Sequence, residues 1–167
     1  MKVAVGLSGG VDSALAAALL VEQGYQVTGV FLECWNEPGC RTDEDRKDAL
    51  KVALKLKISF RLLDFKTEYR RRVMDLTYRE FAKGRTPNPD ILCNREIKFG
   101  LFLNWARQAP GKLKFDYIAT GHYAQIKNNQ LLQSVDKDKD QTYFLALLKE
   151  KQLRRVLFPI GHLLKSQ

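Results

Sequence analysis

Residues 1–13, Met-Lys-Val-Ala-Val-Gly-Leu-Ser-Gly-Gly-Val-Asp-Ser, decide the fold of this chain. Val3, Val5 and Leu7 belong to an apolar run of the length of a buried strand, and the run ends at a Ser-Gly-Gly turn. Apolar residues then recur at helical spacing until Gly24, which ends the pattern. The opening therefore predicts a strand, a glycine-rich loop and a helix.

The same alternation continues along the chain. We expect further strands at 26–32, 58–63 and 117–120, helices at 43–56, 67–83 and 94–107, a hairpin over 123–135 around Asn128-Asn129, and two short helical stretches near the end. Residues 84–92 are expected to be neither helix nor strand, because two prolines lie within three residues. Strands and helices in this order predict an α/β fold, an open parallel sheet with helices on both faces.

Composition indicates one soluble domain. The 167 residues are 45% hydrophobic and 28% charged, and the three cysteines are an odd number that gives no disulfide framework. No stretch approaches the roughly 20 apolar residues of a membrane span, and the start lacks the apolar stretch of a signal peptide, so we expect a cytoplasmic protein without a membrane partner.

The positive charge is distributed unevenly. Residues 1–50 carry four basic and eight acidic side chains, a balance of −4, so the total of +9 places +13 on the other 117 residues. This pattern indicates a polyanionic partner along the later part of the chain, or alternatively a solvated basic face.

The glycine-rich loop has the properties of a phosphate site. It lies where the first strand meets a helix, and its amides, the hydroxyls of Ser8 and Ser13 and the helix N-terminus would all favour an anion. The usual G-x-x-x-x-G-K-[ST] and G-x-G-x-x-G patterns are absent, and no lysine lies nearby in sequence. Asp12 would repel a bare phosphate, so the loop indicates pyrophosphate with Mg²⁺. The alternative is a tight turn with Asp12 as a helix cap.

A second candidate site is the stretch Gly-Arg-Thr-Pro-Asn-Pro-Asp-Ile-Leu-Cys-Asn at 84–94. We expect Cys93 to open a helix, whose N-terminus would lower the pKa of the thiol and favour a nucleophilic thiolate. Three cations near it in sequence would act in the same direction: Arg85, Arg95 and Lys98. Asp90 could orient the thiol or manage a proton. The alternative is a buried structural cysteine.

These motifs resemble the signatures of two protein families. SGGVDS resembles the signature of the PP-loop ATP pyrophosphatases, an adenine nucleotide alpha hydrolase-like superfamily that cleaves ATP between its α- and β-phosphates. GRTPNPDILCNREIKF, together with DYIATGHY, KDQTYFL and LFPIG, resembles the tRNA-specific 2-thiouridylases. Those enzymes adenylate the C2 oxygen of the anticodon wobble uridine and replace it with sulfur from an enzyme persulfide, releasing AMP and pyrophosphate.

The resemblance also implies site residues and partners. ATP with Mg²⁺ would contact Gly6, Leu7, Ser8, Gly9, Gly10, Val11, Asp12, Ser13, Leu32 and Gly121. The tRNA would contact Asn88, Pro89 and Asp90 at the target base, and Lys139, Asp140 and Gln141 elsewhere. Cys93 would be the nucleophile, with Asp90 beside it, and a sulfur-donor protein would supply the persulfide.

The chain departs from the family pattern at its end. The family resemblance implies a second cysteine, which carries or exchanges the persulfide, well after the LFP-x-G segment and at a position beyond Gln167. We therefore expect residues 1–167 to be the N-terminal catalytic domain, its last ~30 residues leading toward a central domain that is absent, as is a C-terminal β-rich domain. Cys34 and Cys40 are expected to be structural, since their spacing fits no usual zinc site, and no metal ligands are assigned. His122 is expected beside the ATP site rather than as a base, and His162 on the surface.

Two other functions stay open from the sequence. A PP-loop amidating synthetase with a small-molecule acceptor would explain SGGVDS but neither PNPDILCN nor the basic remainder. A non-catalytic nucleotide- or RNA-binding module is the third hypothesis.

Overall fold

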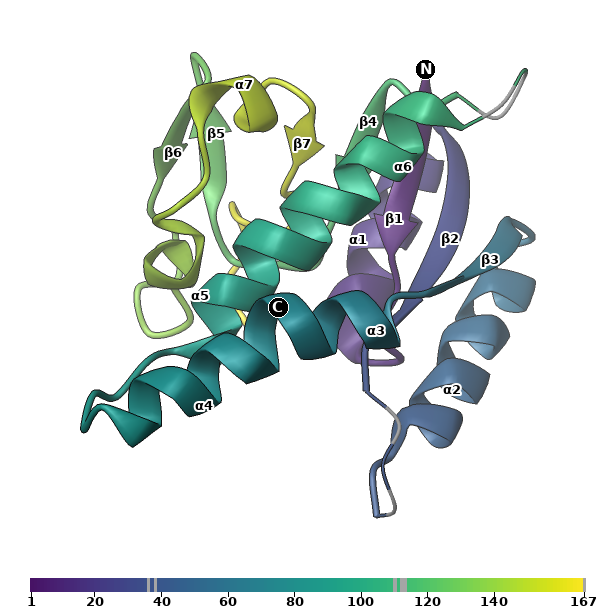
Figure 1. Ribbon diagram of the computed structural model, residues 1–167. Coiled ribbons are helices and arrows are strands. Elements are labelled where there is room, and N and C mark those ends of the chain that lie inside the picture. The colour runs from purple at the N-terminus through teal and green to yellow at the C-terminus, as the bar shows by residue number, and fades with distance from the viewer. Residues whose placement is uncertain (36, 38, 110, 112–113, 167) are drawn as a thin grey trace.

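The fold is built on one parallel sheet, seen in the computed structural model, which describes residues 1–35, 37, 39–109, 111 and 114–166 (Figure 1). The order of the strands is β3-β2-β1-β4-β7, and every neighbouring pair is parallel. The strands are β1 (Lys2–Gly6), β2 (Gln26–Glu33), β3 (Ser59–Asp64), β4 (Tyr117–Ala119) and β7 (Val156–Leu157). The predicted α/β class and the four predicted strands are confirmed, whereas the two-residue edge strand β7 was missed.

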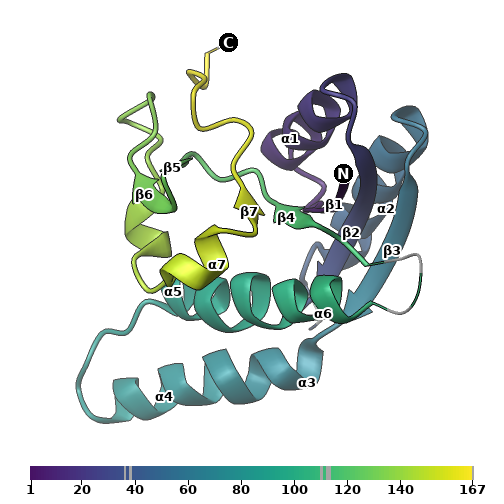
Figure 2. The same cartoon turned by 90° about the horizontal axis from the view of Figure 1, so that it is seen from above.

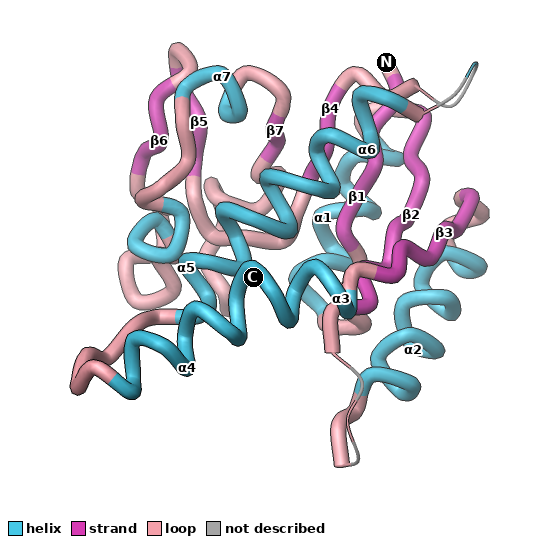
Figure 3. Tube along the Cα trace, viewed as in Figure 1, coloured by secondary structure: helices cyan, strands magenta, loops and turns pink. Residues whose placement is uncertain are grey.

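Helices cover both faces of the sheet, as predicted. α1 (Val11–Glu22) and α2 (Thr42–Lys55) lie on one face. The other face carries a continuous helix made of α5 (Pro89–Cys93), the π-helical segment η2 (Asn94–Phe102) and α6 (Leu103–Gln108) (Figures 2 and 3). We call this continuous helix, residues 89–108, the cysteine helix.

The two faces bury separate apolar cores because side chains alternate along each strand. Val3 and Val5 of β1 pack with Leu20 of α1, whereas Ala4 between them packs with Phe99 and Phe102 of the cysteine helix. A sheet buried on both faces explains why the strands are continuously apolar in sequence.

A second continuous helix lies along the outside of the cysteine helix (Figure 2). It consists of α3 (Lys66–Tyr69), the π-helical segment η1 (Arg70–Met74) and α4 (Asp75–Ala82). The helices predicted at 67–83 and 94–107 are thus confirmed, but their π-helical turns were not foreseen. A Cβ at Gly100 would lie 2.8 Å from the carbonyl oxygen of Arg95, so glycine suits that segment.

The predicted hairpin is also confirmed. β5 (Gln125–Lys127) pairs antiparallel with β6 (Gln130–Leu132). Asn128 and Asn129 turn the chain with φ of 53° and 61°, a left-handed conformation that asparagine tolerates well. The two short helical stretches are η4 (Thr142–Leu145) and α7 (Glu150–Leu153).

The prediction for residues 84–92 was wrong in part, because α5 begins at Pro89. The side-chain oxygen of Asn88 accepts hydrogen bonds from the amides of Asp90 (2.9 Å) and Ile91 (3.4 Å), which makes Asn88 the N-cap. Proline fits the first helical position, where its missing N–H has no partner to lose. Cys93 is therefore the fifth residue of the cysteine helix, near its N-terminus, and does not open it.

None of the helices in the described parts of the chain is both long and apolar enough to cross a membrane.

Candidate active site

The loop between β1 and α1 is closed by its own serines. The hydroxyl of Ser13 donates to the carbonyl of Gly10 (2.9 Å) and accepts from the amide of Ser8 (3.1 Å). The two hydroxyl oxygens lie 3.2 Å apart, with Ser13 buried and Ser8 exposed. The N-cap of α1 is Gly10 and no side chain caps the helix, so Asp12 is not the helix cap that the alternative interpretation required. The loop is a closed turn at a helix N-terminus, a geometry that is suited to an anion.

Two glycines allow the backbone segments around this loop to approach one another. Gly9 has φ of +82°, and a Cβ there would lie 2.6 Å from the carbonyl oxygen of Asp45 in α2. A Cβ at Gly121, just after β4, would lie 2.6 Å from Asp12 C and Ser13 N. A side chain at either position would displace the loop.

A cavity of about 470 Å³ opens beside the loop, where β1, β2 and β4 end. Seven residues that the sequence assigned to ATP line it: Gly6, Leu7, Ser8, Asp12, Ser13, Leu32 and Gly121. Three others assigned to ATP, Gly9, Gly10 and Val11, do not. The cavity also brings together two segments far apart in sequence, through Lys98 of the cysteine helix and Gln141 of the KDQ segment. This edge of an open α/β sheet is where ligands bind.

Several cavity residues were missed from the sequence. They are Phe31, Trp35, Thr42, Asp45 and Thr120. Trp35 and Thr120 follow β2 and β4, Phe31 lies near the end of β2, and Thr42 and Asp45 lie in the first turn of α2. Position after a predicted strand was the signal that could have found Trp35 and Thr120.

Burial is the main influence on the pKa of Cys93. Burial and the charge of Asp90 raise the pKa of its thiol, while Lys98 opposes them. The expected lowering was thus wrong, because burial of the thiol outweighs the attraction of Lys98, and the other two cations are paired with glutamates. Arg85 pairs with Glu80 at 2.8 Å, and Arg95 pairs with Glu96 at 2.7 Å.

A second thiol belongs to the same region. Cys34 lines the cavity, and burial, then the charge of Cys93, raise its pKa to about 12. Cys40 is exposed. Burial also raises the pKa of Tyr69 to about 12, with contributions from Cys93 and Cys34, so the start of the α3–α4 helix borders the two thiols.

The residues predicted to contact tRNA are placed differently from one another. Asp90 and Lys139 are exposed. Asp140 is held in its own loop, where it accepts from the amide of Ser134 at 2.7 Å. The side chain of Gln141 accepts from the amide of Tyr123 at 2.9 Å while lining the cavity. Asn88 and Pro89 start α5 outside the cavity lining.

A match to a family model identifies the family. Residues 1–167 match the family model described as the tRNA methyl transferase HUP domain. The chain belongs to this family. A tRNA-specific 2-thiouridylase MnmA of Streptococcus equi subsp. zooepidemicus is 48% identical over 175 residues, which cover 99% of this chain and 46% of that protein. This HUP domain therefore spans about half the length of the curated relatives it matches, and the predicted resemblance is confirmed.

Solved structures agree with the fold of the HUP domain. The U34-tRNA thiolase NcsA from Methanococcus maripaludis, solved with its 4Fe-4S cluster, is 26% identical with a TM-score of 0.52, over 73% of this chain and 38% of that one. A predicted subunit of a tRNA methyltransferase from Methanocaldococcus jannaschii has a TM-score of 0.58 at 14% identity, over 99% of this chain and 72% of that one.

The HUP domain also supplies a lysine that the sequence gave no reason to expect. Lys165 forms an ion pair with Asp12 of the loop, and its ammonium lies 5.7 Å from the centre of the Tyr123 ring. Its hydrogen bond to Asp12 raises the pKa of Lys165. A cation 153 residues away from Asp12 thus reaches the loop between β1 and α1, and no local sequence pattern predicts this contact.

The histidine that lines the HUP domain cavity lies in an environment that disfavours its charged form. His122 is buried, its Nδ1 lies 2.8 Å from the hydroxyl of Thr120, and its ring packs against Phe99 and Phe158. Burial, then the charge of Lys98, lower its pKa well below 6.5. His122 is therefore suited to shaping the cavity, as expected, and His162 is exposed.

Proposed function

We propose that this chain is the ATP- and tRNA-binding part of a tRNA 2-thiouridylase. The observation that carries the proposal is that the phosphate loop, the cysteine helix and the KDQ segment meet at one cavity. Relatives almost half identical over the whole chain carry that name. The +13 balance of residues 51–167 suits a polyanionic substrate.

ATP would lie along the edge of the sheet. The loop amides, Ser8 and the N-terminus of α1 suit its phosphates, and the apolar Leu32 suits the adenine. No group of three or more metal-ligating side chains occurs among the described residues. Mg²⁺ usually takes one or two carboxylates and completes its shell with phosphate oxygens and water, and the cavity offers Asp12 and Asp45 for that purpose. Bound Mg²⁺ would neutralise phosphate charge.

The acceptor would be the C2 carbonyl of an unstacked uridine. Its oxygen attacks the α-phosphorus of ATP and pyrophosphate leaves, so the former carbonyl oxygen becomes part of a good leaving group. The terminal sulfur of a persulfide that a donor protein loads on the second family cysteine attacks C2, and AMP departs with the oxygen. The Cys93 thiolate then attacks the inner sulfur of that persulfide, which frees 2-thiouridine and leaves a disulfide between the two cysteines. A base in an anticodon loop costs least to unstack.

The test uses a protein that contains these 167 residues, incubated with ATP, Mg²⁺, a persulfide donor and unmodified tRNA, followed by mass spectrometry of the nucleosides. Cys93→Ser should abolish 2-thiouridine formation while ATP binding persists. Cys40→Ser is the matched control, because Cys40 is exposed and does not line the cavity, and it should retain activity. Wild-type yields of 2-thiouridine from Cys93→Ser would refute the assignment.

A further inference from the structure

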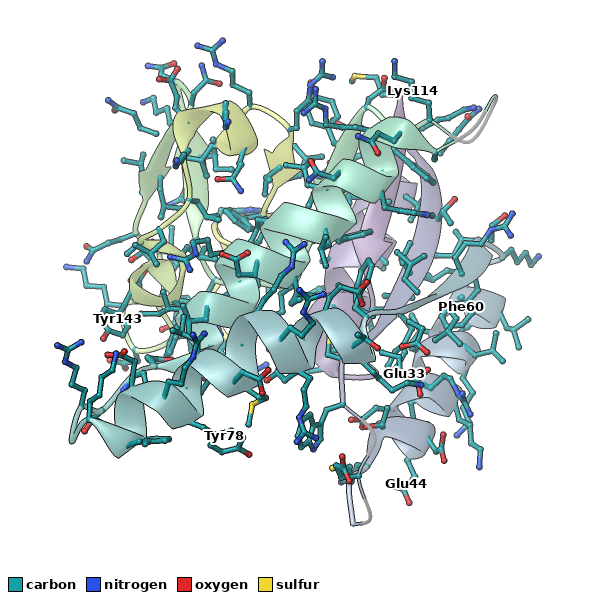
Figure 4. All side chains as sticks on the ribbon, in the orientation of Figure 1. Glu33, Glu44, Phe60, Tyr78, Lys114 and Tyr143 are labelled. Atoms are coloured by element: carbon teal, nitrogen blue, oxygen red, sulfur yellow. The ribbon has the colours of Figure 1, made fainter. Side chains whose placement is uncertain are left out.

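A second and larger cavity, of about 830 Å³, lies between the cysteine helix and α7. Six basic side chains line it: Arg95, Arg107, Lys149, Lys151, Arg154 and Arg155. We call it the basic groove. Arg95 and Arg107 come from the cysteine helix, whereas the other four lie in or beside α7. Figure 4 shows many nitrogen-tipped side chains around α7.

Most of this charge is not neutralised by the protein. Glu96 is the single acid in the groove lining among the described residues, so the lining carries a net charge of +5. Arg95 pairs with Glu96, and Arg154 pairs with Glu150 at 2.7 Å. In the described part of the chain, no ion pair joins Arg107, Lys149 or Lys151 to an acid. Uncompensated cations on both walls favour an anionic ligand.

The groove is a fixed feature of the fold because Gln152 connects its two walls. The side-chain amide of Gln152 donates to the carbonyl of Phe99 in η2 at 2.7 Å, and its oxygen accepts from the amide of Lys149 at 2.8 Å. Phe99 and Leu103 are buried beneath the groove. The backbone positions that carry the cations are therefore set before any ligand binds.

We propose that the basic groove binds the sugar-phosphate backbone of the RNA substrate. This inference rests on the proposed function. The groove starts at Arg95, two residues after Cys93, and extends along the helix to Arg107. Twelve residues of helix span at most about 18 Å, which is long enough to contact several successive phosphates of one RNA strand.

An RNA backbone fits the groove better than an acidic protein does. Protein interfaces depend on large apolar or aromatic anchors, and Leu147, 43% exposed, is the one exposed large apolar side chain in the described lining. Lysines and arginines spaced along a helix, without such an anchor, are typical of phosphate contacts.

The experiment measures tRNA binding by this chain as a function of salt concentration. The groove variant Arg107→Gln/Lys151→Gln removes one cation from each wall, and the control Lys47→Gln/Lys55→Gln removes two exposed cations from α2. Losing two phosphate contacts should reduce the slope of log K against log salt by about 2. From about 50 to about 200 mM salt, the groove variant should lose about tenfold less affinity than the wild type. The α2 control should keep the wild-type slope.

Two further measurements keep the result interpretable. Arg107→Lys/Lys151→Arg preserves both charges and should bind tRNA with the wild-type slope. This variant distinguishes the effect of lost charge from the effect of a folding defect. If the wild type binds tRNA and the groove variant shows the same slope, the assignment of the basic groove as an RNA-binding site is refuted, but the proposed function stands. A chain that binds ATP but shows no salt-dependent tRNA binding would overturn both. If the groove variant lost affinity for an acidic protein such as the sulfur donor while its tRNA slope stayed unchanged, the proposal would also fall.

Discussion

Gly121→Ala tests whether the end of β4 positions the phosphate loop. The added Cβ would lie 2.6 Å from Asp12 C and Ser13 N, whereas ordinary contacts begin near 3.4 Å. Both atoms belong to the backbone at the N-terminus of α1, so no side chain can rotate away. The loop would have to move by about 0.8 Å, the difference between those two distances.

A shift of that size breaks hydrogen bonds between loop amides and phosphate, because a donor–acceptor distance near 2.9 Å would approach about 3.7 Å. One such bond to a charged group contributes about 1.5–3 kcal/mol. At about 1.4 kcal/mol per tenfold, the Kd for ATP should rise roughly 10- to 100-fold. The overpacking should also cost about 1–3 kcal/mol of folding stability.

The assay is calorimetric titration of ATP with Mg²⁺, paired with thermal unfolding. Gly24→Ala is the matched control, since Gly24 lies just beyond the far end of α1 with φ of +82° and no atom within 4 Å of an added Cβ. That variant should lose about 1–2 kcal/mol of stability from backbone strain but no affinity for ATP. An ATP affinity for Gly121→Ala within twofold of the wild type would refute the reasoning, and so would an equal loss in Gly24→Ala.

Three further predictions concern titration and packing. Lys98→Met should raise the pKa of Cys93 further and slow its alkylation by iodoacetamide at about pH 8, measured by peptide mass spectrometry, whereas Lys98→Arg should not. Because the pKa of His122 is lowered on folding, the unfolded state binds more protons, and the stability of the wild type should fall as the pH drops below about 6.5. The urea midpoint of the wild type should therefore be lower at about pH 5 than at about pH 7, and this difference should shrink in His122→Gln. Asn94→Ala removes a 3.1 Å hydrogen bond to the carbonyl of Phe144 and should cost about 1–3 kcal/mol in urea unfolding, and a loss below about 0.5 kcal/mol would count against that link.

Local patterns were sufficient for most of the fold. Apolar runs and helical spacing predicted four strands, a parallel sheet and helices on both faces, because each signal resides in neighbouring residues. β7 was missed because a two-residue strand has no period to detect. The start of α5 was missed because proline was treated as a breaker, although Asn88 caps the helix and Pro89 is its first residue.

The candidate site was also predicted only in part from the sequence. SGGVDS and PNPDILCN indicated an ATP-dependent tRNA 2-thiouridylase, and seven of the ten residues assigned to ATP line the cavity. The lowered pKa expected for Cys93 was wrong because a pKa depends on burial and on partners. The sequence could not show that Arg85 and Arg95 pair with glutamates.

The sequence by itself determined the α/β architecture, the phosphate loop and the family, since each depends on residues that are adjacent along the chain. The tertiary structure alone decided which distant groups meet. It brings Lys165 to Asp12, Gln141 to the cavity and the cations of α7 opposite those of the cysteine helix. Such contacts depend on how the helices pack on the sheet, and no spacing in the sequence encodes that packing directly.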